Sequence, residues 1–204
     1  MPATDRAATP ERSTALDKAT LRALSVPAMT LLTAVAAQIS IPTDPLGIPV
    51  TLQTLAVLLC AMALGPKLGA ASMLLYLATG AVGVGVFADG QAGLATILGQ
   101  TGGYLIGFVA AQPIAHAIIR RRDATIRGWG AVLVAGLALH AAIFAIGVPW
   151  LYTTRLLDPD ANALSAWDAV YYGCLVFVPG AVLKSGIAAW IGARLLPHVA
   201  RRLW

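Results

Sequence analysis

Charged side chains are scarce in this sequence, and their scarcity excludes an ordinary soluble protein. Only 11% of the 204 residues are charged, whereas 58% are hydrophobic, and the mean hydropathy is +0.78. A soluble domain carries about 25% charged residues. The composition therefore indicates an integral membrane protein.

Catalytic motifs are missing as well. Glutamate occurs only as Glu11, and no HExxH motif is present, so a membrane metalloprotease would lack its ligands. The absence of GxSxG argues against an intramembrane hydrolase. The two cysteines, Cys60 and Cys174, lie in apolar runs without a CxxC pair, which predicts neither a disulfide nor a zinc site. We therefore expect a protein that is not an enzyme and that uses no metal or cofactor.

Motifs for energy coupling are also absent. Without GxxxxGK[ST], the chain cannot bind ATP through an ordinary P-loop. It is short for a complete secondary transporter and has no convincing internal repeat. These absences favour a protein that binds a molecule without supplying the energy for its transport.

Apolar stretches of about 20 residues, the length that spans a bilayer as a helix, recur from Leu21 onwards. They predict an all-α integral membrane protein with six transmembrane helices, at approximately 23–41, 48–64, 68–86, 95–119, 129–151 and 171–196. Residues 1–20 are polar and lack the apolar core of a secretory signal. We expect them to form a partly disordered cytoplasmic tail, followed by a single membrane domain over residues 21–204.

Basic residues collect in alternate loops. They occur in the tail, at Lys67, in 120–127 and near the C-terminus, whereas the opposite loops carry only Arg155. By the positive-inside rule, both termini are predicted to be cytoplasmic. Because the basic residues are dispersed over short loops, they indicate topology rather than a nucleic-acid site.

One charge lies inside a predicted span. Lys184 interrupts the last apolar run, where a lysine costs roughly 2.5 to 3.5 kcal/mol to insert, and no Asp or Glu occurs in any predicted span. Lys184 can snorkel to an interface, donate to carbonyls of a loop that dips inward, or await an anionic or polar ligand. We favour the ligand, because intramembrane ionisable groups are usually functional.

Other polar side chains are expected on the same outer side as Lys184. Apolar walls with a few placed hydrogen-bonding groups are typical of a small-ligand pocket. The candidate substrate-binding residues are Lys184, Asp89, Gln53, Thr51, Gln91, Phe87, Thr101 and Tyr104. The glycine-dense run 80–107 permits either close backbone approach to a ligand or close helix packing.

Two further patterns concern contacts between helices. His140 lies mid-span, where an interhelical hydrogen bond is favoured over a ligand or proton-relay role. In the first helix, Thr30 with Ala34 and Thr33 with Ala37 form small-xxx-small pairs. Such pairs allow another helix to approach closely, either from this chain or from a partner.

Residues 37–108 and 179–192 resemble the BioY family, the biotin-binding S components of energy-coupling factor (ECF) transporters. PVTLQTLAVLL, LGPKLGAASMLLYL and TGGYLIGF carry the resemblance. It implies a six-helix protein in a bacterial cytoplasmic (inner) membrane that captures biotin from outside. It also implies partners: one transmembrane coupling protein, contacted through the first helix at Thr30, Ala34 and Ala37, and two cytoplasmic ABC ATPases.

Two departures from the family pattern affect the expected site. The family's PGDLxK reads 179-PGAVLK-184, with Ala181 at the acidic position, and GPTGGY reads 99-GQTGGY-104. The ureido N–H groups of biotin then need another acceptor, for which Asp89 is a candidate. Lys184 is expected either to donate to the ureido oxygen or to pair with the valerate carboxylate.

Other functions are weaker alternatives. The nearest is an S component for another vitamin, which competition between biotin, desthiobiotin and unrelated vitamins would separate from a biotin protein. A small channel or structural membrane protein, in which Lys184 tunes conduction or packing, comes next. A membrane-embedded enzyme is third, because the catalytic residues are missing.

Overall fold

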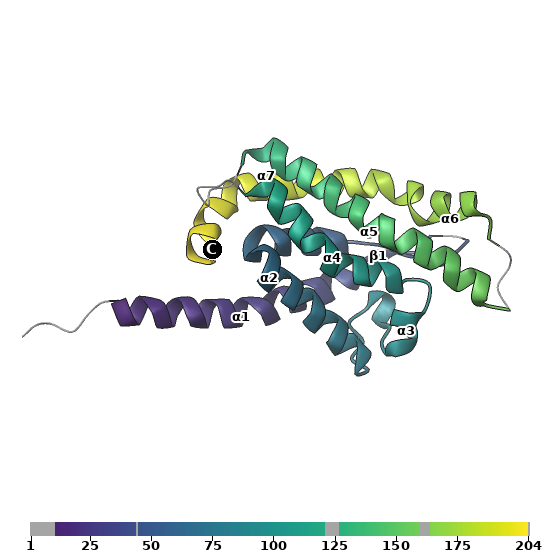
Figure 1. The fold of residues 1–204 in the computed structure, drawn as a ribbon, viewed down its shortest axis with the longest axis horizontal. Helices are drawn as coiled ribbons and strands as arrows, with labels where there is room; N and C mark the ends of the chain where they lie inside the picture. The colour runs from purple at the N-terminus through teal and green to yellow at the C-terminus, as the bar shows by residue number, and fades with distance from the viewer. Residues whose placement is uncertain (1–10, 44, 121–126, 160–163, 204) are drawn as a thin grey trace, which may run out of the picture.

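Long apolar runs form helices here because a bilayer offers no water to backbone N–H and C=O groups, which must bond within the segment. The computed structural model in Figure 1 describes residues 11–43, 45–120, 127–159 and 164–203. The long helices are α1 (Glu11–Ala37), α2 (Gln53–Ala81), α4 (Gly102–Ile119), α5 (Trp129–Leu157) and α7 (Val178–Leu203). The short elements are α3 (Leu94–Leu98), α6 (Ala166–Gly173) and 3-10 turns at Ala88–Gly90 and Leu175–Phe177.

Helix α2 is a hairpin of two antiparallel segments. Gly65 has φ 75° and ψ −175°, and Pro66 follows it; glycine adopts this left-handed backbone without a steric penalty. The side-chain amide of Gln53 lies 2.7 Å from the hydroxyl of Tyr76, although a straight helix would separate the two residues by about 34 Å. The second and third predicted helices are therefore the two halves of α2.

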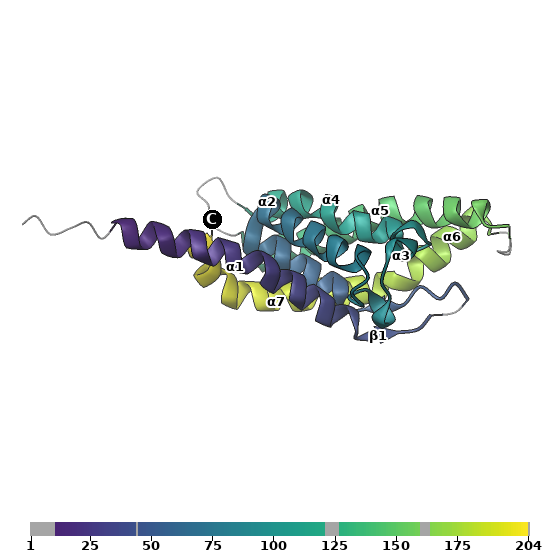
Figure 2. The same cartoon turned by 90° about the horizontal axis from the view of Figure 1, so that it is seen from below.

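The number of membrane crossings follows from this hairpin. Within the described ranges, five helices are long and apolar enough to cross a membrane, and the reversal at Gly65 makes α2 cross twice. The six predicted helices are confirmed. Accordingly, the start of α1 and the yellow end of α7 lie at the same end of the molecule (Figures 1 and 2).

Several predicted boundaries are wrong. Helix α1 begins at Glu11 instead of residue 23, so residues 11–20 are helical, and residues 1–10 lie outside the described ranges. The fourth predicted helix is split at 99–101 into α3 and α4. The last begins at Val178, because Cys174 (φ −134°, ψ −60°) ends α6 before the chain enters α7.

An all-α architecture also overlooks a small β-ribbon. Strands β1 (Ser40–Ile41) and β2 (Val50–Thr51) pair antiparallel, Ser40 opposite Thr51 and Ile41 opposite Val50. The proline- and glycine-rich segment between them cannot continue a helix. The ribbon brings residues 46–51 back across the end of the bundle opposite the start of α1.

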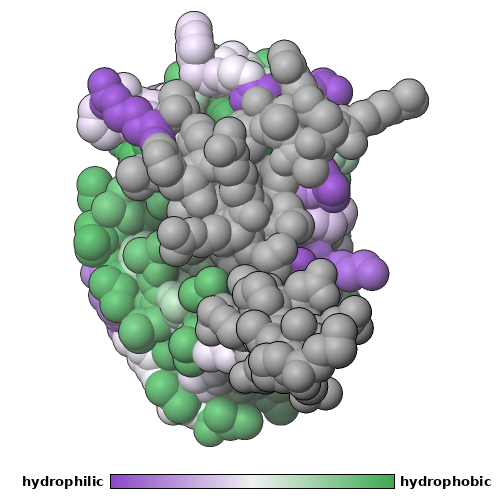
Figure 3. All heavy atoms as spheres, turned by 90° about the vertical axis from the view of Figure 1, so that its left-hand side faces the viewer, coloured by the Kyte–Doolittle hydropathy of each residue, from purple (hydrophilic) through white to green (hydrophobic). Residues whose placement is uncertain are grey.

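The helices enclose a core and expose an apolar outer surface. Helix α2 packs against α1, α4 and α7, and α5 packs against α4 and α7. Seen from the end where α1 begins, hydrophobic side chains cover one flank (Figure 3). Leu31 and Leu183 are each 65% exposed, which suits contact with lipid tails as apolar as leucine.

Candidate ligand-binding site

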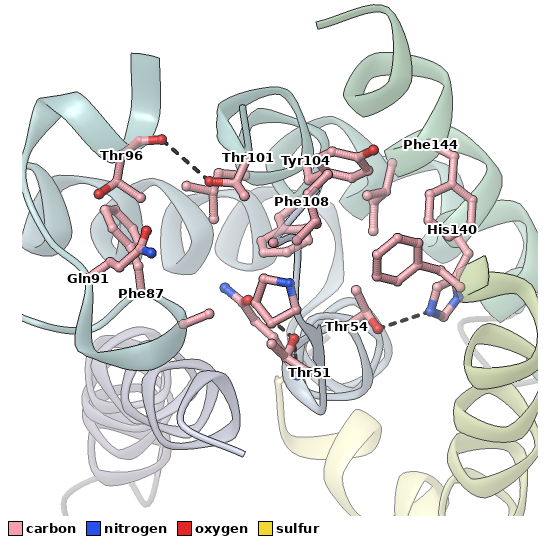
Figure 4. Close-up of a pocket in the computed structure, with 18 of the residues that line it drawn as sticks. Thr51, Thr54, Phe87, Gln91, Thr96, Thr101, Tyr104, Phe108, His140 and Phe144 are labelled. Atoms are coloured by element: carbon pink, nitrogen blue, oxygen red, sulfur yellow. Dashed lines mark hydrogen bonds between the residues drawn. The ribbon is translucent and has the colours of Figure 1, made fainter. Parts of the chain in front are cut away.

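A cavity opens between α2, α4, α5 and α7 at the end of the bundle opposite the start of α1, under the β-ribbon and the 87–91 turn (Figure 4). It contains about 810 Å³ of space between atoms, including the part open to solvent. Seven of the eight predicted site residues line it: Lys184, Gln53, Thr51, Gln91, Phe87, Thr101 and Tyr104. The structure thus brings together residues that are up to 133 positions apart.

Aromatic rings form much of the cavity wall. Phe87 is 2% exposed and packs edge-on against Tyr76, with ring centroids 5.5 Å apart. On the other side, the ring centroids of Phe144 of α5 and Phe177 lie 6.3 Å apart. These flat, apolar surfaces suit a flat or bicyclic apolar ligand body.

Sequence reasoning missed several lining residues. They are Thr96, Phe108, His140, Phe144 and Phe177, with the aliphatic residues beside them. A signal was available for some: Phe108 follows Tyr104 by four positions, and Phe144 follows His140 by four. Residues at i and i+4 share a helix face, but the sequence does not say that this face borders a cavity.

Lys184 is buried in the cavity wall. Its side chain is 8% exposed, and Nζ donates a 3.0 Å hydrogen bond to the backbone oxygen of Thr51 in β2. Of the three predicted alternatives, the bond to an inward-dipping loop is therefore observed. An ammonium has three N–H donors, so this bond leaves donors for a ligand.

No acidic side chain from the described ranges lines the cavity. Lys184 therefore places a positive charge in the wall without a carboxylate beside it. Ala181, at the family's acidic position, is buried at 4% exposure and lies outside the lining. A buried ammonium without a counter-ion favours a ligand that brings an anionic or strongly accepting group.

A buried hydrogen-bond chain holds Gln53. Its amide nitrogen donates to the Tyr76 hydroxyl at 2.7 Å, and that hydroxyl donates to the backbone oxygen of Val86 at 2.9 Å. The hydroxyl of Thr51 lies 3.5 Å from Gln53 Oε1. Gln53 and Lys184 therefore meet in one corner of the cavity, around Thr51.

His140 makes the interhelical hydrogen bond that its position predicts. Nδ1 lies 2.8 Å from the backbone oxygen of Gly136, and Nε2 lies 3.1 Å from Oγ1 of Thr54 on α2. Because a carbonyl oxygen only accepts, Nδ1 carries the proton, and Nε2 of the neutral ring accepts from the Thr54 hydroxyl. His140 also lines the cavity (Figure 4).

Asp89 does not lie where the sequence reasoning placed it. It is exposed in the 3-10 turn Ala88–Gly90, and its carboxylate accepts a hydrogen bond from Ser40 of β1. It is absent from the cavity lining. The expectation that Asp89 supplies an acceptor inside the site is therefore wrong in this geometry.

The predicted docking residues on α1 mostly face their own chain. Thr30 is 8% exposed and donates to the backbone oxygen of Ser72 at 2.9 Å, and Ala37 is fully buried. Ala34 is half-buried and packs against the core. Thr30 thus serves the contact between α1 and α2, one of the two possibilities that the small-xxx-small pairs allow, and the docking of the half-buried Ala34 on a partner stays a prediction.

Polar contacts join the loops over the cavity. Gln38, just after α1, donates to the backbone oxygen of Phe87 at 3.0 Å, and its Oε1 accepts from the backbone N–H of Gly90 at 3.1 Å. Together with the bond between Ser40 and Asp89, these contacts fasten the β-ribbon to the turn that carries Phe87.

Fold and site together define a multi-pass membrane protein with a ligand cavity near one face and no catalytic centre in the described residues. The family model described as the BioY family matches residues 10–201. The chain belongs to the BioY family, whose members are substrate-binding transporter subunits and not enzymes.

Named relatives and a solved structure agree with this membership. The "Probable biotin transporter BioY" of Pyrococcus horikoshii is 37% identical over 164 residues, covering 80% of this chain and 89% of that protein. The "Biotin transporter BioY" of Thermotoga maritima is 33% identical over 166 residues, covering 81% of this chain and 90% of that protein. A crystal structure of the S-component for biotin from an ECF-type ABC transporter has the same fold, with TM-score 0.76, 24% identity and coverage of 94% and 96%.

Proposed function

We propose that this protein captures biotin at the outer face of the membrane as the S component of an ECF-type ABC transporter. The observation that carries the proposal is the cavity: aromatic walls, neutral hydrogen-bonding groups and the buried ammonium of Lys184 without a carboxylate among the lining residues. Biotin offers a matching set of groups, namely an apolar bicyclic body, a ureido group and a carboxylate.

The residues that line the cavity contact different parts of the ligand. Phe87, Phe144 and Phe177 provide surface for the bicyclic body. Lys184 donates from the corner next to Thr51, where it meets either the ureido oxygen or the carboxylate. Each hydrogen bond to the ligand replaces hydrogen bonds to water. Its contribution to the binding free energy is therefore the difference between the two.

Transport needs components that this chain does not provide. The sequence has no P-loop, so we propose that a transmembrane coupling protein and two cytoplasmic ABC ATPases supply the energy. We also propose a bacterial cytoplasmic membrane with both termini inside. The support is that Lys67, Arg120, Arg127 and Arg194 belong to the end at which α1 begins, whereas Arg155 lies at the opposite end of α5.

Calorimetric titration of the detergent-solubilised protein with biotin tests the proposal. We expect saturable binding of biotin, competition by desthiobiotin and no competition by unrelated vitamins. Folded protein that binds a different vitamin and ignores biotin would replace the proposal with an S component of other specificity. The Ala181 departure makes this the alternative to examine.

A further inference from the structure

The orientation of the Gln53 amide follows from its neighbours. A tyrosine hydroxyl has one proton, and Tyr76 Oη lies 2.9 Å from the backbone oxygen of Val86, which can only accept. The proton therefore points to Val86. Tyr76 Oη must then accept from Gln53 across the 2.7 Å contact, so the group of Gln53 that faces Tyr76 is the NH₂.

This orientation leaves Gln53 Oε1 on the other side of the amide. There it has one long contact, 3.5 Å from the Thr51 hydroxyl, and a carbonyl oxygen has two lone pairs. The residue lines the cavity, and its side chain is 5% exposed. Gln53 therefore offers the cavity an acceptor with capacity to spare.

The surroundings hold the amide in place. Tyr76 is fully buried and packs edge-on against Phe87. The backbone N–H of Gln53 also donates to the Thr51 hydroxyl at 3.2 Å, which ties the start of α2 to β2. Rotating the amide by 180° would set its oxygen against Tyr76 Oη with no proton between them.

Together these observations point to the missing acceptor of the site. Resting on the proposed binding of biotin, we propose that Gln53 Oε1 accepts a ureido N–H of the ligand and that Tyr76 is the positioning residue that turns this oxygen toward it. Lys184 in the same corner donates to the ureido oxygen. An uncharged amide held by a buried tyrosine then serves where the family pattern has a carboxylate at position 181.

The test is a double-mutant cycle read by biotin titration. Tyr76→Phe keeps the ring and its packing but frees the amide, so we expect affinity to fall roughly three- to tenfold, the worth of one neutral hydrogen bond. In a Gln53→Ala background the same change should have no effect. In a Gln53→Glu background it should not weaken binding, because a carboxylate presents an acceptor whichever way it turns and the change removes the hydroxyl oxygen that this carboxylate would face.

A second ligand separates positioning from general loss of structure. Biotin methylated on the ureido nitrogens lacks the N–H donors, so Tyr76→Phe should not change its affinity. Tyr171→Phe, on the exposed α6 outside the cavity lining, is the matched control and should bind biotin like the unchanged protein. If Tyr76→Phe does not fold, Gln53→Met replaces it, and this variant should weaken the binding of biotin but not that of the methylated ligand.

The outcomes distinguish this inference from the function on which it rests. If the unchanged protein does not bind biotin, the proposed function fails first. If it binds but Tyr76→Phe weakens binding equally with and without Gln53, or equally for the methylated ligand, then Tyr76 has only a structural role. Full affinity in a folded Gln53→Met variant would also overturn the inference.

Discussion

Lys184 Nζ donates a 3.0 Å hydrogen bond to the backbone oxygen of Thr51, a residue 133 positions earlier in the chain. The bond joins α7 to the β-ribbon at the edge of the cavity. It uses one of the three N–H donors of the buried ammonium and leaves the others for a ligand. Lys184 therefore both ties the β-ribbon to α7 and places a positive charge in the site.

Replacing Lys184 tests its role in binding. Lys184→Met keeps most of the side-chain volume but removes the ammonium, so we expect biotin affinity to fall by about 1.5 to 3 kcal/mol, the worth of a charged hydrogen bond. The control is Arg194→Met, because Arg194 is exposed and lies on the lipid-facing side of α7. Its Cζ lies 4.0 Å from the centroid of the Trp190 ring. Unchanged affinity in folded Lys184→Met protein would refute the assignment.

A side chain at Gly80 should displace the Phe87 ring that lines the cavity. A Cβ at this position would lie 2.1 Å from Cζ of Phe87, so Gly80→Ala must move the ring that forms the cavity wall. Overpacking of this kind costs about 1–3 kcal/mol, and we expect both thermal stability and biotin affinity to fall.

The matched control for Gly80 is Gly186→Ala. Nothing lies within 4 Å of a Cβ built on Gly186, and alanine is the better helix former. Thermal unfolding and titration of both variants in the same detergent provide the comparison. Wild-type affinity in Gly80→Ala would mean that Phe87 does not shape the site.

Asp89 should tolerate loss of its charge. Its carboxylate is exposed and outside the cavity lining, and exposed substitutions usually change free energies by no more than about 0.5 kcal/mol. We expect Asp89→Asn to bind biotin within about twofold of the unchanged protein. A tenfold loss would restore the role that sequence reasoning gave to this residue.

Thr30 should matter for folding and not for docking. Its hydroxyl donates to Ser72 on α2, and its side chain is 8% exposed, so Thr30→Leu overpacks this contact by about 1–3 kcal/mol. We expect a lower unfolding temperature, with little change for Leu31→Met on the neighbouring exposed position. Normal stability with loss of co-purification of the transporter module would instead assign Thr30 to a partner surface.

Much of the fold could be predicted because a bilayer imposes strong local rules. Apolar run lengths predict the spans, and Pro and Gly mark their ends; the reversal at Gly65 and Pro66 fell between two predicted helices. Boundaries were less accurate, as at Glu11 and Val178, because helix ends depend on tertiary contacts as well as composition.

The site was predictable as a set of residues but not as a geometry. The scarcity of charge, the isolated Lys184 and the polar residues at the outer helix ends were readable along the chain, because inserting polar groups into lipid carries a large cost. They by themselves determined the membrane class and most of the polar residues that line the cavity.

Only the tertiary structure decided which way those residues face. It placed Asp89 outside the cavity, turned Thr30 onto α2, buried Ala37, and paired Gln53 with Tyr76 across the hairpin. The physical reason is that orientation depends on partners far away in sequence: the single proton of Tyr76 is committed to Val86, and this commitment alone turns the oxygen of Gln53 away from Tyr76.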